Sequence, residues 1–236
     1  MPGYLVLEGG AEFGGQMEMP DRRALELAGG LDIPVRIVPT AAAPDQNHQR
    51  AGGNGVRWFR DLGASDVAAL PIINKVSAND SALAAELGRA RLIYLLGGFT
   101  GYLGETLKNS LCWQAALEAY AGGALLAGSS AGAMVLCQYY FDPARGQVVP
   151  GLNLLPNTCV LPHHNTFGRR WSARLTALLP GVVLLGLDER TGLLDDGPGP
   201  RKSSWRVYGQ GHVTIYRHGQ TIVYTPGQQF EDAFVA

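Results

Sequence analysis

A buried apolar run followed by a glycine- and serine-rich turn decides the fold: Ala124-Leu125-Leu126-Ala127 leads directly into Gly128-Ser129-Ser130-Ala131-Gly132. Four apolar residues without polar alternation are typical of a strand buried on both faces. The residues from Ala131 to Tyr139 are predicted to form a helix. The turn fits Gly-x-Ser-x-Gly, and a strand, sharp turn and helix are the context in which this pattern presents a serine nucleophile.

The residue types around Ser130 suit that chemistry. Small neighbours avoid collisions between strand and helix, so the hydroxyl can stand at the carboxyl edge of the sheet, and the N–H of Ala131 can point at a substrate oxygen. A second glycine pair, Gly97-Gly98, ends another apolar run, and the N–H of Gly98 is the candidate second donor of an oxyanion hole. The alternative for Ser129 or Ser130 is a plain helix cap.

Working outward, further short apolar runs alternate with segments of helical spacing. The runs are Tyr4–Leu7, Ile33–Val38, Val67–Ile73 and Leu92–Leu96. There are four such helical segments: one starts after Pro20, one ends near Gly63, one starts at Asp80-Ser81, and one ends before Gly122. This alternation predicts an α/β fold, a three-layer sandwich with a mainly parallel central sheet and helices on both faces. Ligands bind such sheets at the carboxyl ends of the strands.

The end of the chain is predicted to be β-rich. A helix around Phe167–Leu179 and an apolar run Val182–Leu187 are followed by three strand-like segments, the last two joined by a hairpin turn. These segments are Trp205–Tyr208, Val213–Tyr216 and Ile222–Tyr224. No linker-like stretch interrupts the pattern, so we expect one domain over residues 1–236.

A serine nucleophile needs a base and an orienting acid. His163 and His164 follow a short β-like run, and because consecutive residues on an extended chain point to opposite sides, only one of them can face Ser130. Asp188-Glu189 follows the run Val182–Leu187 and supplies candidate acids at the right edge of the sheet. Other acids remain open: Asp142, Asp195 and Asp196. As metal ligands, the two histidines lack a third ligand at familiar spacing.

Together these segments resemble the serine peptidases that comprise peptidase E and cyanophycinase. The similar segments are Gly9–Glu12, Ala78–Asp80, Leu96–Thr100, Gly128–Ala133, Gly151–Pro156, His163-His164 and Gly186–Thr191. They occur in the family's order over nearly the whole chain. The resemblance implies a class-I glutamine-amidotransferase-like fold with Ser130 as nucleophile, His164 as base and Glu189 as acid. It implies an oxyanion hole at Gly98 and Ala131.

The expected function is that of a serine exopeptidase that cleaves short peptides through an acyl-enzyme, with no metal or cofactor. The resemblance puts Thr100 and His163 in the substrate pocket, and we expect Arg169, Arg170 or Arg174 to bind a peptide carboxylate. The chain departs from the family in having Phe99 and Thr100 after its Gly-Gly, and Pro162-His163 before His164. Three alternatives stay open: a cyanophycinase-type hydrolase of β-Asp-Arg linkages, an esterase with His212 or His218 as base, and a non-catalytic peptide-binding protein.

The composition of the chain limits the kinds of partner and the cellular location that we expect. Nineteen basic and 20 acidic side chains give a net charge of −1, which argues against nucleic acid as a partner. No apolar run approaches 18 residues and the start of the chain lacks a signal-peptide pattern, so we expect neither a membrane span nor export. Three widely spaced cysteines favour buried thiols in the cytoplasm. The resemblance implies a homodimer.

Overall fold

A computed structural model describes residues 3–197 and 204–231. Its main sheet has eight strands in the order β14-β11-β10-β1-β5-β4-β2-β3. Five strands pair in parallel: β1 (Leu5–Glu8), β5 (Leu125–Ser129), β4 (Leu92–Leu95), β2 (Pro34–Val38) and β3 (Asp66–Ala69). Three strands extend it antiparallel beyond β1: β10 (Thr191–Leu194), β11 (Ser204–Gly209) and β14 (Gln229–Glu231). The mainly parallel sheet is therefore confirmed.

Helices cover both faces of this sheet, because the strand side chains alternate between two apolar clusters. Val6 of β1 packs with residues of α1 (Glu18–Ala28) and α2 (His48–Asp61) on one face. Leu5 and Leu7 belong to the other cluster, with α3 (Ser81–Gly88), α4 (Thr100–Leu107), α5 (Leu111–Ala121) and α6 (Ala131–Leu136). The chain is thus the expected three-layer sandwich.

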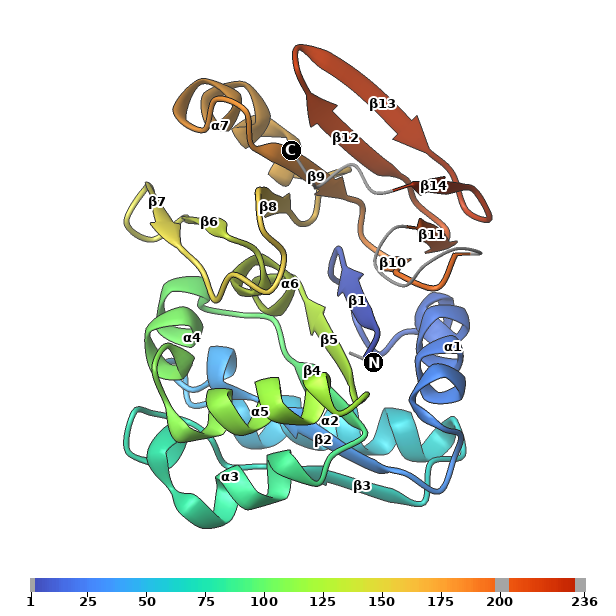
Figure 1. The fold of residues 1–236 in the computed structure, drawn as a ribbon, viewed down its shortest axis with the longest axis vertical. Helices are drawn as coiled ribbons and strands as arrows, with labels where there is room; N and C mark the ends of the chain where they lie inside the picture. The colour runs from blue at the N-terminus through green and yellow to red at the C-terminus, as the bar shows by residue number, and fades with distance from the viewer. Residues whose placement is uncertain (1–2, 198–203, 232–236) are drawn as a thin grey trace.

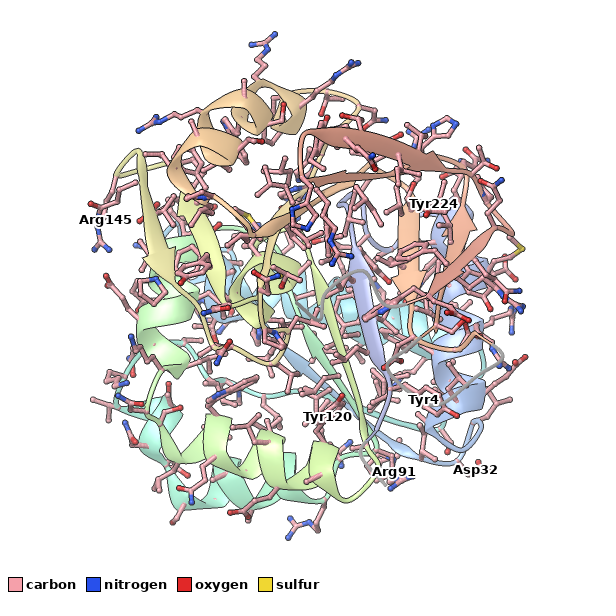
Figure 2. All side chains as sticks on the ribbon, turned by 45° about the horizontal axis from the view of Figure 1, so that its top comes forward. Tyr4, Asp32, Arg91, Tyr120, Arg145 and Tyr224 are labelled. Atoms are coloured by element: carbon pink, nitrogen blue, oxygen red, sulfur yellow. The ribbon has the colours of Figure 1, made fainter. Side chains whose placement is uncertain are left out.

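A second, four-stranded sheet lies beside the main one, in the order β13-β12-β9-β8. Its strands are β8 (Thr158–Leu161), β9 (Val183–Leu187), β12 (Val213–Arg217) and β13 (Gln220–Tyr224). Figure 1 shows this sheet at the top, next to α7 (Ser172–Leu178). The hairpin of β6 (Tyr139–Asp142) and β7 (Gln147–Pro150) lies nearby, and Figure 2 shows Arg145 pointing outward from its turn.

Some element boundaries differ from the sequence predictions. The helix expected over Ala131–Tyr139 ends at Leu136, because the next residue is extended and Tyr139 already begins β6. The predicted helix around Phe167–Leu179 is divided into a 3-10 turn, Gly168–Trp171, and α7. The run Val182–Leu187 does form a strand, but in the second sheet.

The helix α4 was missed, because two of its eight residues are glycines, which disfavour helix. The structure explains both of them, and a Cβ at Gly101 would overlap the carboxylate of Asp142 at the end of β6. A Cβ at Gly104 would lie 2.7 Å from the hydroxyl oxygen of Tyr140, so this glycine allows α4 to pack closely on β6. Tertiary packing therefore overrides the weak local preference.

Candidate active site

Ser130 stands on a strained turn between β5 and α6. Its backbone has φ 49° and ψ −110°, which a non-glycine residue rarely adopts. Its N–H donates to the carbonyl of Glu8 at the end of β1 (2.9 Å). The flanking glycines leave no room for side chains: a Cβ at Gly132 would overlap the Leu95 carbonyl, and one at Gly128 would lie 2.5 Å from the Gly132 backbone. These contacts fix the predicted elbow and present the hydroxyl at the sheet's carboxyl edge.

The hydroxyl of Ser130 meets a histidine, and that histidine meets a carboxylate. The Ser130 Oγ lies 3.0 Å from Nε2 of His163, and Nδ1 of His163 lies 2.8 Å from Oε1 of Glu189. The His163 and Glu189 side chains are 21% and 29% exposed, so a substrate can reach them. The arrangement can take a proton from the serine and hold the imidazole in one orientation.

The expectation that His164 faces Ser130 is wrong. Its ring is buried on the opposite side, with Nδ1 3.4 Å from Asp188 Oδ1 and Nε2 2.9 Å from the hydroxyl of Tyr216. The two histidines do point in opposite directions, as expected, but His163 is the one beside the serine. His163 was placed in the substrate pocket by resemblance, and the structure puts it next to Ser130 instead.

Backbone hydrogen bonds fix which histidine turns toward the serine. The N–H of His163 donates to the carbonyl of Gly9 (2.7 Å), and the N–H of His164 donates to that of Leu187 (3.0 Å). The N–H of Arg190 donates to the carbonyl of Gly10 (3.0 Å). A Cβ at Gly10 would overlap the His163 ring. The loop after β1 therefore joins the segments that follow β8 and β9, and its glycine makes room for the imidazole.

Three residues after His163 complete its surroundings, and sequence reasoning gave them no role. Phe167 stacks on the imidazole with ring centroids 4.8 Å apart. The side chain of Asn165 accepts a hydrogen bond from the N–H of Glu189 (3.0 Å). The Thr166 hydroxyl lies 3.5 Å from Oε1 of Glu189. The only signal in the sequence was their position directly after the histidine pair.

Asp188 forms a separate buried cluster behind the Ser130 site. It accepts from the N–H of His212 (2.9 Å), and its Oδ2 lies 3.3 Å from Nδ1 of the same residue. Burial acts to raise the pKa of Asp188, but the hydrogen bonds from His164 and His212 outweigh it, so the pKa lies below its usual value. The cluster therefore favours the ionised form of Asp188. The hydrogen-bond partners of its carboxylate are His164 and His212, whereas His163 bonds to Glu189.

The other acids left open by the sequence have different partners. Asp142 accepts from the N–H of Ala144 (3.0 Å), and Asp195 accepts from the N–H of Leu5 (2.7 Å). Asp196 pairs with Arg23 (2.7 Å). Only Glu189, among the acids considered, is hydrogen-bonded to the histidine beside Ser130 in the part of the chain that the structure describes.

The candidate oxyanion residues lie close to the serine. A Cβ at Gly97 would be 3.2 Å from Cβ of Ser130, so the glycine pair approaches this serine directly. Gly98 has φ 137°, and a Cβ there would overlap the carbonyl of Ala41, so only glycine fits. Ala131 is the first residue of α6. Thr100 is buried, with its hydroxyl 3.6 Å from the Met134 sulfur, in a wall that also contains Gly98.

The three arginines have other surroundings. Arg174 donates to the carbonyl of Gly146 (2.6 Å) and lies over the ring of Phe141. Arg169 lines a cavity with His164 and Asp188, behind the histidine pair. Arg170 is exposed on the 3-10 turn. No recorded contact brings any of them to Ser130.

Among the described residues, no hydrogen bond joins the side chain of Ser130 to a cysteine or to a histidine other than His163. The three cysteines are free and buried. Within residues 3–197 and 204–231, no group of three His, Cys, Asp or Glu side chains is arranged to hold a metal ion. No helix in these residues has the length and apolarity needed to cross a membrane. The histidines of the esterase alternative, His212 and His218, have no recorded contact with Ser130; the first bonds to Asp188 and the second lies in the β12–β13 turn.

Comparison with solved structures supports the fold. A peptidase from an acI-B1 actinobacterium superposes with a TM-score of 0.86 at 29% identity, covering 98% of this chain and 97% of the other. A putative peptidase E protein from Listeria monocytogenes EGD-e gives a TM-score of 0.60 at 19% identity, covering 95% and 99%. The second likeness is one of fold alone.

Comparison with known sequences identifies the family. A cyanophycinase from Synechococcus elongatus is 30% identical over 202 residues, which is 80% of this chain and 60% of that protein. A cyanophycinase from Trichormus variabilis has the same identity over 64% of its length. The chain thus spans less than two thirds of these relatives. The model of peptidase family S51 matches residues 5–198, and this chain therefore belongs to peptidase family S51.

Proposed function

We propose that this protein is a serine exopeptidase that hydrolyses short peptides through Ser130, His163 and Glu189. The observation that carries the proposal is the continuous hydrogen-bonded chain from Ser130 Oγ to His163 (3.0 Å) and from His163 to Glu189 (2.8 Å). Its membership of a peptidase family supports the reaction type. The strained backbone of Ser130 supports a functional role for the serine, because such strain is characteristic of active sites.

In the proposed reaction His163 Nε2 removes the proton from Ser130 Oγ as the oxygen attacks the substrate carbonyl. The N–H groups of Gly98 and Ala131 stabilise the oxyanion. His163 then gives its proton to the leaving amine, the C–N bond breaks, and an acyl-Ser130 ester forms. A water molecule, deprotonated by His163, hydrolyses the ester and releases the acid. Glu189 accepts from Nδ1 throughout and stabilises the imidazolium.

The test is amino-acid release from dipeptides and longer peptides, free or blocked at each terminus, by the wild type and by Ser130→Ala. We expect release by the wild type and a loss of roughly 10³-fold or more in the variant, because the nucleophile is gone. Substrates blocked at one end should resist cleavage, as an exopeptidase requires. Equal release by both proteins would reduce Ser130 to a helix cap.

A second candidate is a cyanophycinase-type hydrolase of β-Asp-Arg linkages. The observation in its favour is the 30% identity to cyanophycinases. Release of β-Asp-Arg from cyanophycin, with no release from α-linked peptides, would favour this candidate. Tight peptide binding without turnover, unchanged in Ser130→Ala, would favour a non-catalytic binding protein instead. A homodimer and a cytoplasmic location belong to the proposal as well, and size-exclusion chromatography with light scattering tests the first.

A further inference from the structure

The loop after β1 places the carboxylate of Glu12 next to Ser130. Oε2 of Glu12 accepts a hydrogen bond from the hydroxyl of Ser129 (2.9 Å). A Cβ at Gly97 would lie 3.2 Å from Glu12 Oε1 and 3.2 Å from Ser130 Cβ. The second carboxylate oxygen therefore faces the space over Gly97, beside the nucleophile. Within residues 3–197 and 204–231, no Lys or Arg nitrogen lies within 4.0 Å of this carboxylate.

The loop that carries Glu12 is strained and firmly held. The residues on either side, Ala11 and Phe13, both have a left-handed backbone, with φ 59° and 62°. Phe13 packs against the rings of Phe59 and Tyr94, with centroids 6.3 and 5.4 Å apart. Such strain persists only where the surroundings enforce it. The position of the Glu12 carboxylate is thus set by the fold before any substrate arrives.

A cavity of about 490 Å³ opens beside Glu12, and its lining suits a positive charge. It begins at Gly97 and Gly98, the proposed oxyanion side of the serine, and runs along α2. Aromatic side chains and carboxylates line it, together with a single guanidinium. The aromatic residues are Phe13, Trp58 and Phe99, the carboxylates are Glu12, Asp45 and Asp61, and the guanidinium is that of Arg57. Aromatic faces and carboxylates are the two groups that bind ammonium and guanidinium ions in proteins.

We propose that Glu12 binds a positively charged nitrogen on the acyl side of the substrate and so determines specificity. The proposal rests on the proposed function, because the acyl side is defined by attack of Ser130. The charged nitrogen has two sources, the α-ammonium of an amino-terminal residue or the side chain of Lys or Arg. The first would make the enzyme an exopeptidase that reads the amino terminus, and the second a peptidase selective for basic residues.

The test compares the wild type with Glu12→Gln, which keeps an oxygen to accept from Ser129 but removes the charge. One substrate pair has a neutral side chain and a free or acetylated α-amino group. The other pair is amino-terminally blocked, with arginine or citrulline at the cleaved bond. We expect kcat/KM for the charged member of one pair to exceed that of its neutral partner by roughly 10- to 100-fold, and Glu12→Gln to abolish that preference. Glu118→Gln, on the exposed face of α5, is the matched control and should keep it.

A binding arm separates this inference from the proposed function. In Ser130→Ala, calorimetry measures the affinity for phenylalaninamide against N-acetylphenylalaninamide, and for N-acetylargininamide against N-acetylcitrullinamide. The charged ligand of one pair should bind at least about 10-fold more tightly, and Ser130→Ala/Glu12→Gln should bind both members alike. An affinity ratio unaffected by Glu12→Gln overturns the inference, even if Ser130 is the nucleophile. Absence of cleavage with a Glu12-dependent affinity ratio overturns the peptidase and leaves the cation site.

Discussion

At the scale of single residues, the strained turn at Ser130 could be predicted, and the histidine that lies beside it could not. Ser130 was visible because its elbow requires small residues in a fixed order after a strand. The choice between His163 and His164 depends on which of two adjacent side chains turns inward. That choice is made by backbone hydrogen bonds to Gly9 and Leu187. Both residues are more than 20 positions away along the chain, so a local sequence pattern cannot predict these bonds.

Alanine substitutions of the two histidines should therefore have different effects, one on activity and the other on stability. His163→Ala is expected to lower kcat by roughly 10³-fold or more while leaving stability almost unchanged, because a partly exposed base is removed. His164→Ala should retain activity at temperatures where it is folded. It should lower the free energy of unfolding by about 2 kcal/mol, since the buried Asp188 loses a donor.

Steady-state kinetics and urea unfolding of both variants check this pair. The reverse pattern, with His164→Ala inactive although fully folded and His163→Ala active, would restore the base that the sequence suggested. Equal inactivity of two folded variants would show that His164 also takes part in the chemistry.

At the scale of elements, the sequence predicts the strands of the parallel sheet, but it does not predict which sheet the later strand β9 joins. Leu92–Leu95 and Leu125–Ser129 are apolar on both faces, so their burial follows from composition alone. The apolar run ending at Leu187 looks the same in sequence, yet it pairs with β8 and β12 in a separate sheet. Pairing partners are a long-range property, which a local pattern does not contain.

One glycine of β9 shows how such pairing positions the site. A Cβ at Gly186 would overlap the ring of His164, and the three nearest atoms to it all belong to that ring. We expect Gly186→Ala to lower the free energy of unfolding by about 1–3 kcal/mol, because the imidazole is held by Asp188 and Tyr216 and cannot move freely.

A double-mutant cycle tests the cause. With His164→Ala as background, the ring is absent and Gly186→Ala should cost less than about 0.5 kcal/mol, which gives a coupling of at least about 0.5 kcal/mol in denaturant unfolding. If the two losses simply add, the clash with His164 is not what requires glycine in this strand.

At the scale of the whole molecule, a buried pair of carboxyl groups joins two strands of the main sheet to the two helices that cover one of its faces. Glu8 of β1 is fully buried and bonded to the Tyr94 hydroxyl of β4, and Asp21 of α1 accepts from the indole of Trp58 in α2 (2.8 Å). The charge of Asp21 acts to raise the pKa of Glu8, and the charge of Glu12 acts to raise the pKa of both carboxyl groups. Four elements therefore meet at one titrating pair beneath the Ser130 site.

This pair makes global stability depend on pH in a predictable direction. Burial raises the pKa of Asp21 to about 7, against the lowering effect of the Trp58 bond, and burial and Asp21 raise that of Glu8. An unfolded aspartate titrates at about 3.9, so between that pH and about 7 the folded chain holds a proton that the unfolded chain has released. Through Asp21, each pH unit in this window therefore removes up to about 1.4 kcal/mol of stability, and this contribution levels off above its folded pKa.

Asp21→Asn keeps an oxygen that can accept from the Trp58 indole, and the amide does not titrate. We expect the difference in the free energy of unfolding between pH 5 and pH 7.5 to shrink by roughly 2 kcal/mol in this variant, measured by urea unfolding at each pH. Asp61→Asn, which removes an exposed aspartate at the end of α2, should reproduce the wild-type difference. A pH dependence that persisted unchanged in Asp21→Asn would have to come from another group, and the raised pKa of Asp21 would then contribute nothing to the stability of the fold.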